Sequence, residues 1–235
     1  MFLGDVVYKE KRKGDDNVTI RAIHYSNDDE EYSEMIYNFR GQAHYSAMIK
    51  KICEWSHRTE FVIRVLKDTL EELPQQQIMI LSHNKSMLSY LYSAIEFRQI
   101  GTVGYYVGGM KESALKESES KQIILATYAM AEEALDIKTL ACLIMATPKT
   151  DVTQAVGRIL RMKHEMPLVI DIVDQHEVFV RQFKKRKTFY KKCKYSIYEC
   201  NSDTYDGDWE SIMKKDNTLF KPKSDKTIMR KVCLI

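Results

Sequence analysis

Two arginines spaced three residues apart, Arg158 and Arg161, are the side chains in this sequence best suited to bind a phosphate. They close the run QAVGRILR, in which Gln154 lies one helical turn earlier and Gly157 lets the backbone approach a partner closely. Helical residues three apart share a face, and guanidinium groups stay charged and present a planar fork of donors. An R-x-x-R pair taken alone more often lies on a solvated helix face. The full Q-x-x-G-R-x-x-R pattern favours phosphate binding.

The segment before these arginines would position them. Residues 141–145 (ACLIM) have the length and composition of a buried strand, and Thr147-Pro148 closes the run. A strand, a loop and a helix in this order place the start of the helix at the carboxyl end of the strand. Ligands of open α/β sheets bind at that end.

These segments resemble motifs of superfamily 2 helicases, the DNA and RNA translocases built from two tandem RecA-like domains. Residues 154–161 are similar to motif VI, and residues 124–137 (ILATYAMAEEALDI) are similar to motif V, with Ala134 where the family usually has glycine. Residues 143–149 fit the strand that lies between them. The resemblance covers roughly residues 77–174, and the spelling of motif V is most similar to helicases of large DNA viruses and of UvsW-type phages.

The resemblance implies that this chain is the second motor domain of an ATP-dependent helicase. ATP and Mg²⁺ would be held mainly by an upstream RecA-like domain, and this domain would supply arginine fingers across the cleft. Arg161 would reach the γ-phosphate, beside Arg158, and Gln154 would orient them. Three further residues would bind the nucleotide: Gly157, Asp136 and Glu133.

The sequence has no G-x-x-x-x-G-K-[S/T] loop, the backbone cradle that holds a triphosphate. The acidic run at residues 28–31 has no apolar strand leading into it, so it predicts a solvated loop rather than a metal-binding box. We therefore expect no metal site in this chain. We also expect the chain alone to be inactive as an ATPase.

Residues that follow predicted strands should contact the nucleic-acid backbone. Thr127 follows the motif V strand, and its hydroxyl suits one phosphate contact. Gly108 and Gly109 lie between a strand and a helix, where they could admit a phosphate or simply form a turn. Ser82 and Lys85 follow another strand; Lys85 could reach the backbone, and Ser82 either contacts a phosphate or caps the next helix.

A predicted amphipathic helix at residues 177–195 carries eight Lys or Arg residues between positions 181 and 194 and no acidic residue. Such a helix is typical of a solvated face, a nucleic-acid face or a membrane surface. The resemblance to a motor raises the nucleic-acid interpretation, because phosphate contacts require clustered cations. The predicted contacts are Lys184, Lys185 and Lys187.

Strands and helices alternate around these sites, and the strands lack alternating polarity. That pattern predicts a RecA-like α/β fold: a doubly wound parallel sheet with helices on both faces. A helical region at 45–69 should break near residue 56. Residues 44–195 would form the RecA-like domain. The N-terminal segment (1–43) would precede it and would contain a β-hairpin formed by residues 6–8 and 18–23. Residues 196–235 would form a C-terminal helical extension.

Composition limits the remaining possibilities. The chain has 235 residues, 44% of them hydrophobic, and a net charge of +3, which alone does not argue for nucleic acid. Five scattered cysteines without a C-x-x-C pair favour reduced, intracellular thiols. No apolar run reaches the roughly 20 residues of a membrane span.

The motif spelling favours DNA as the partner, with RNA as a second possibility. The alternative function is a stand-alone nucleic-acid clamp without ATPase activity. The intact set of Gln154, Arg158 and Arg161 argues against it, because a clamp has no need of a γ-phosphate sensor.

Overall fold

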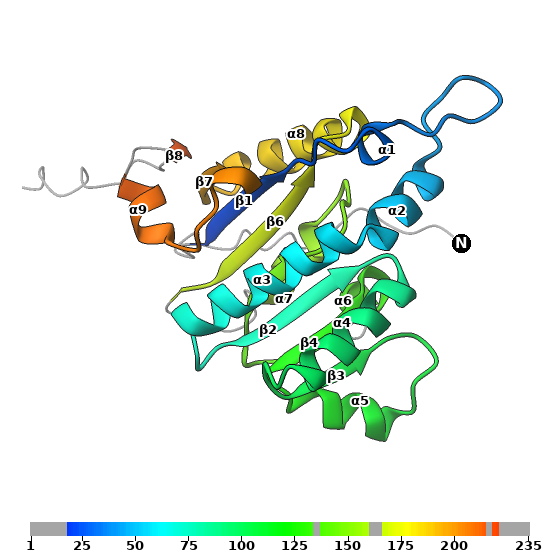
Figure 1. The fold of residues 1–235 in the computed structure, drawn as a ribbon. Helices are drawn as coiled ribbons and strands as arrows, with labels where there is room; N and C mark the ends of the chain where they lie inside the picture. The colour runs from blue at the N-terminus through cyan, green and yellow to red at the C-terminus, as the bar shows by residue number, and fades with distance from the viewer. Residues whose placement is uncertain (1–17, 134–136, 160–165, 215–217, 221–235) are drawn as a thin grey trace, which may run out of the picture.

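The computed structural model describes residues 18–133, 137–159, 166–214 and 218–220. They form one eight-stranded sheet in the order β3-β4-β2-β5-β6-β1-β7-β8 (Figure 1). The first seven strands in that order run parallel, and β8 pairs antiparallel with β7. The strands are β1 (Thr19–Tyr25), β2 (Gln77–Ser82), β3 (Val103–Tyr106), β4 (Ile123–Thr127), β5 (Leu140–Met145), β6 (Leu168–Asp174), β7 (Ser196–Asn201) and β8 (Thr218–Phe220).

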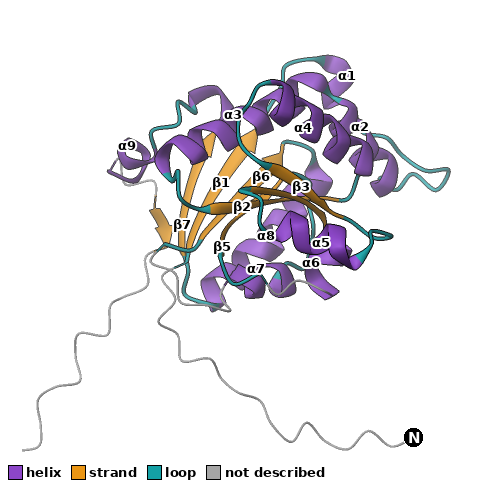
Figure 2. Cartoon of the chain, turned by 90° about the horizontal axis from the view of Figure 1, so that it is seen from below, coloured by secondary structure: helices purple, strands orange, loops and turns teal. Residues whose placement is uncertain are grey.

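Helices cover both faces of the sheet, as Figure 2 shows. One layer contains α1 (Glu30–Ser33), α2 (Tyr45–Glu54), α3 (Ser56–Glu72), α4 (Lys85–Phe97) and α9 (Trp209–Lys214). The other layer contains α5 (Glu112–Glu119), α6 (Tyr128–Glu133), α7 (Thr153–Ile159) and α8 (Glu177–Lys192). A short 3₁₀ turn, η1 (Ser202–Thr204), follows β7. The predicted doubly wound, RecA-like architecture is therefore confirmed.

The central strands β2, β4 and β5 are almost entirely apolar because both of their faces are buried. In the register between β5 and β6, Ile144 lies opposite Ile170 and Leu143 lies opposite Val169. The first pair packs into the core beneath α2, α3 and α4, and the second pair packs into the core beneath α6, α7 and α8. A strand that faces two cores cannot alternate apolar and polar residues, which explains the pattern in the sequence.

The predicted break near residue 56 is confirmed. Helix α2 ends at Glu54 and α3 begins at Ser56, with Trp55 between them in an extended conformation. At the other end of α3, Leu73 leaves helical geometry immediately before Pro74, which cannot continue a helix.

The predicted N-terminal hairpin is wrong for residues 18–23. Strand β1 pairs in parallel with β6 along Thr19–Tyr25 and with β7 along residues 19–24, so both of its hydrogen-bonding edges are occupied. Residues 6–8, the other half of the predicted hairpin, lie outside the described residues. The apolar run at 18–23 is a central strand. The prediction of a helical extension after residue 195 is also wrong at its start, because residues 196–201 form β7, which pairs in parallel with β1.

The acidic run at 28–31 is also more ordered than predicted. Asp29 caps α1, because its carboxylate accepts hydrogen bonds from the backbone N–H groups of Glu31 and Tyr32. Acidic residues in the first turn of a helix are stabilised by the helix dipole, which accounts for Glu30 and Glu31. Across the described ranges, no helix is long and apolar enough to cross a bilayer.

Candidate nucleotide and nucleic-acid site

The seven parallel strands all end at one edge of the sheet, which we call the carboxyl edge. Strands β2 and β4 are neighbours there, with Ser82 directly opposite Thr127. Helix α7, which contains residues 154–159 of the motif VI pattern, follows β5 from the same edge, and Gln154 is exposed on it while Gly157 is half-buried. Thus the structure brings the predicted strand-end residues and the start of the motif VI helix to one edge.

Several predicted nucleotide-binding residues lie outside what the structure describes. Arg161 and Asp136 belong to segments that are not described, and the side chains of Arg158 and Glu133 are not described either. Their roles stay predictions.

The loop from β5 to α7 is held by side chains from four helices. Its four consecutive carbonyl oxygens, those of residues 146–149, each accept a hydrogen bond from a side chain. In order along the loop, the donors are Arg58 at 2.8 Å, Tyr128 at 2.5 Å, Tyr45 at 2.9 Å and Arg186 at 2.6 Å. These donors belong to α3, α6, α2 and α8, so both helical layers fix where α7 begins.

The first of these donors, Arg58, is fully buried and pairs with the equally buried Asp174 at the end of β6. Its Nε and Nη2 atoms donate to the two carboxylate oxygens, the Nη2 bond being 2.8 Å long, and Tyr32 donates its hydroxyl at 2.6 Å. Burial alone would lower the pKa of Arg58, but the Asp174 carboxylate outweighs it and raises that pKa above its ordinary value. The guanidinium is therefore charged when it contacts Ala146.

Arg186 in α8 forms the matching pair on the other face of the sheet. Its Nε and Nη2 atoms donate to Asp171 at 2.8 and 2.9 Å, and the hydroxyl of Tyr190 donates to the same carboxylate at 3.2 Å. Burial opposes the charge, yet Asp171 raises the pKa of Arg186. This arginine was counted in the sequence among the cations of a basic helix face, but it is a core residue that holds Lys149.

A polar cluster that the sequence did not predict lies at the ends of β2 and β5. The hydroxyl oxygen of Thr147 accepts the backbone N–H of His83 at 3.0 Å and lies 3.0 Å from its Nδ1. The His83 ring lies 4.6 Å from the ring of Tyr128, whose other neighbour is the ammonium of Lys149 at 5.0 Å. Lys149 is also ion-paired with Glu132.

This cluster keeps His83 neutral. The residue has an exposed side, but desolvation of its ring, together with the positive charge of Lys149, lowers the pKa of His83 to about 4. The contact between Nδ1 and the Thr147 hydroxyl fixes the orientation of the ring, because the hydroxyl can donate to Nδ1 or accept from it. A neutral His83 therefore presents its Nε2 atom at the carboxyl edge without a positive charge. Its place directly after a strand was the only signal in the sequence.

Two predictions for the segment after β2 need correction. Ser82 is fully buried, and its hydroxyl accepts the backbone N–H of Asn84 at 3.0 Å, so it is not placed to contact a phosphate. The cap of α4 is Asn84, whose side chain accepts the Met87 N–H at 3.0 Å. Lys85, the first residue of α4, is exposed as a backbone contact requires.

The other strand-end residues differ in how far they suit a phosphate. Thr127 is half-buried at the end of β4. Gly108 and Gly109 are exposed after β3, and Gly109 has a φ of +91° with no atom within 4 Å of the place where a Cβ would lie. The positive φ alone accounts for glycine there, because side chains rarely adopt that conformation.

The basic helix α8 is less free than its composition indicates. Lys184 and Lys185 are exposed, but the Lys187 ammonium lies 2.9 Å from Oε1 of Glu199 in β7. His24 lies 3.0 Å from the other oxygen of Glu199. Burial would raise the pKa of Glu199, but hydrogen bonds from His24 and Lys187 lower it. Lys187 therefore has an acidic partner from a distant strand, which corrects its prediction as a free phosphate contact.

Side chains that could bind a metal ion are not grouped among the described residues. No group of three or more His, Cys, Asp or Glu residues among them could hold a metal ion. The two carboxylates of β6, Asp171 and Asp174, are each occupied by a buried arginine. What this edge offers are hydrogen-bond donors and cations.

Comparison with known proteins gave sequence relatives among viruses, while no family model matches. A provisionally named ATP-dependent RNA helicase of Acanthamoeba polyphaga mimivirus is 37% identical over 204 residues, which is 83% of this chain and 39% of that protein. A protein of African swine fever virus with the same kind of name is 30% identical over 135 residues, 53% of this chain and 26% of its own length. The chain therefore spans less than half of these relatives.

Solved structures share the fold at lower sequence identity. T4 UvsW superimposes with a TM-score of 0.59 and 19% identity over 79% of this chain and 42% of UvsW. The C-terminal domain of the DEAD-box protein Dbp5 superimposes with a TM-score of 0.51 and 14% identity over 67% of this chain and 90% of that domain. This chain is therefore similar in sequence to viral proteins named as helicases, and it shares its RecA-like fold with T4 UvsW and with the C-terminal domain of Dbp5.

Proposed function

We propose that this chain is the second motor domain of an ATP-dependent nucleic-acid helicase or translocase. It supplies Arg158 and Arg161 to ATP that a first RecA-like domain holds with Mg²⁺. The observation that carries this proposal is the support of the β5–α7 loop, where four side chains fix four successive carbonyls. Such support positions α7, which contains residues 154–159 of the Q-x-x-G-R-x-x-R pattern, at the carboxyl edge.

Arginines delivered in this way stabilise the negative charge that develops on a transferring phosphoryl group. Such a contribution is worth about 10³ to 10⁵ in turnover. Arg161 would contact the γ-phosphate, and Gln154, which is exposed on α7, would orient the arginines. Three residues would line the nucleotide beside them: Gly157, Asp136 and Glu133.

The carboxyl edge also supports contact with a nucleic-acid backbone. Thr127 and Lys85 supply a hydroxyl and an ammonium there, beside the neutral ring of His83. Contacts of this kind bind phosphates and do not read bases, so we expect little sequence preference. The residue pattern of motifs V and VI favours DNA, whereas the viral relatives are named RNA helicases. Binding should therefore be tested with both DNA and RNA.

The proposal is tested by Arg161→Ala in a longer protein that carries both RecA-like domains. Turnover of ATP should fall by about 10³-fold or more, and nucleic-acid binding should be unchanged, because the arginine acts on the transition state. Arg181→Ala is the matched control, since this exposed arginine of α8 pairs only with Glu177 of its own helix among the described residues. It should leave turnover unchanged.

Two outcomes would contradict the proposal. If Arg161→Ala weakened nucleic-acid binding and spared turnover, α7 would face the nucleic acid and the stand-alone clamp would be favoured. Robust ATP hydrolysis by the 235-residue chain alone would show that no second domain is required.

A further inference from the structure

The segment between α1 and α2 exposes aromatic side chains that the proposed function does not use. Residues 36–43, which we call the 36–43 hairpin, project beyond the sheet in Figure 1. Phe39 at its tip is 92% exposed, Tyr37 is 59% exposed and Ile36 is 36% exposed. Isolated apolar side chains on a surface are ordinary, but three within four residues on a projecting segment indicate a binding surface.

The hairpin has a defined conformation. Tyr37 and Ala43 form an antiparallel bridge, and the N–H and side-chain oxygen of Asn38 both bond across the turn. That oxygen accepts the N–H groups of Arg40 at 2.9 Å and of Gln42 at 3.1 Å. Gly41 closes the turn with a φ of +72°. The tip is therefore held in one place, so that a partner need not order it on binding.

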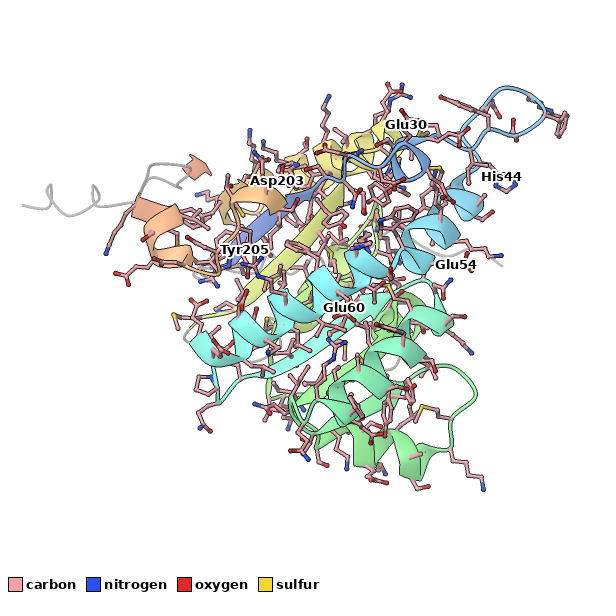
Figure 3. All side chains as sticks on the ribbon, viewed as in Figure 1. Glu30, His44, Glu54, Glu60, Asp203 and Tyr205 are labelled. Carbon is pink, nitrogen blue, oxygen red and sulfur yellow. The ribbon has the colours of Figure 1, made fainter. Side chains whose placement is uncertain are left out.

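The base of the hairpin is fixed to the carboxyl edge. The N–H of His44 donates to the carbonyl of Ile36 at 2.8 Å, and the next residue, Tyr45, donates its hydroxyl to Pro148 at 2.9 Å. Pro148 belongs to the β5–α7 loop. Figure 3 shows the projecting segment between the labelled residues Glu30 and His44. The hairpin thus stands at the edge where the nucleic acid is proposed to run.

The chemistry of the tip suits a nucleobase. The guanidinium of Arg40 lies 5.1 Å from the centroid of the Phe39 ring, and the hairpin has no acidic residue. An exposed aromatic ring beside an arginine stacks on bases of any type, because every base has a π face. The neighbouring helix α1 is acidic at Glu30 and Glu31, which disfavours a phosphate backbone on that side.

We propose that the 36–43 hairpin stacks Phe39 on an unpaired base of single-stranded nucleic acid bound along the carboxyl edge. This inference rests on the proposed nucleic-acid binding and adds a base contact to it. It also adds Arg40 as the cation beside that base.

The test uses the 235-residue chain and single-stranded DNA and RNA oligonucleotides that contain 2-aminopurine, whose fluorescence is quenched by stacking. Phe39→Ala should raise Kd by roughly fivefold to a hundredfold and change the 2-aminopurine signal, whereas Phe39→Trp should retain binding. Phe97→Ala is the matched control: Phe97 is 89% exposed, but it ends α4 shortly before β3 begins, at the opposite edge of the sheet. It should bind like the unaltered chain. Parallel titrations decide between DNA and RNA.

The possible failures are distinguishable. If the Phe39→Ala variant binds DNA and RNA normally while the Lys85→Gln variant binds them weakly, the hairpin proposal is wrong and the proposed function is still supported. If the unaltered chain binds neither DNA nor RNA at low salt, the hairpin proposal and the proposed nucleic-acid binding are both wrong. If Phe39→Ala leaves nucleic-acid binding intact and weakens association with a first RecA-like domain, the hairpin is a domain contact and the base-stacking proposal is wrong.

Discussion

Replacing Arg58 by methionine should destabilise the whole domain, because it leaves a buried carboxylate without its partner. The side chain is 0% exposed and makes two hydrogen bonds to Asp174 and one to the carbonyl of Ala146. Methionine fills much of the same volume but donates nothing. Asp174, also 0% exposed, would keep the hydroxyl of Tyr32 as its side-chain donor among the described residues.

Breaking a buried ion pair from one side costs about 3 to 5 kcal/mol of unfolding free energy. In a protein of this length, each kcal/mol lowers Tm by about 2 to 4 °C, so Arg58→Met should lower it by roughly 6 to 20 °C. Urea unfolding followed by circular dichroism measures the free energy directly through the transition midpoint and its slope. Adding Asp174→Asn to Arg58→Met should recover part of the loss, because the unpaired charge is then removed.

The matched control is Arg98→Met. Arg98 forms a bidentate pair with Glu60, but both side chains are 40% exposed, so solvent screens the pair and its removal should barely move the unfolding midpoint. The reasoning is refuted if Arg58→Met costs no more than Arg98→Met. It is also refuted if Arg58→Met and Asp174→Asn are additive, because coupled residues in one network should not be.

Three further predictions concern other parts of the domain. A Cβ at Gly104 would lie 2.9 Å from the backbone of α5, so Gly104→Ala should cost about 1 to 3 kcal/mol in urea unfolding; a neutral change would show that α5 shifts freely. The pKa of His83 is lowered from 6.5 to about 4, so its contribution to stability should be present above pH 6.5 and lost as the pH falls toward 4. An NMR titration should place this pKa below 6.5, and Lys149→Met should raise it; a ring that titrates normally in both proteins would contradict the cluster. Replacing the exposed Lys184 and Lys185 by glutamine should lower the slope of log affinity against log salt by about 0.7 to 0.9 for each phosphate that is no longer neutralised. An unchanged slope would show that these lysines of α8 face solvent and do not contact the nucleic acid.

The sequence predicted the strands β2 to β6 and the helices between them because the determinants of these elements are local. The predicted strand at 141–145 lies within β5, and the predicted break near residue 56 coincides with the boundary between α2 and α3. A strand buried on both faces and a helix with one apolar stripe each have a pattern that can be recognised over a few residues.

What the sequence could not predict depends on partners that are distant in the chain. The apolar run at 18–23 fits a hairpin as well as a central strand, and only its pairing with β6 and β7 decides between them. Arg58 is separated by 116 positions from Asp174, and Lys187 finds its acid, Glu199, on a later strand. No local pattern shows that an arginine on a helix is buried.

The support of the β5–α7 loop has a consequence for how force would pass through this domain. Turning α7 relative to the sheet would strain hydrogen bonds at several adjacent carbonyls together, and their donors belong to both helical layers. A movement that begins at α7 is therefore shared by α2, α3, α6 and α8. Under the proposed function, a displacement of α7 at the nucleotide would therefore be transmitted to both helical layers together.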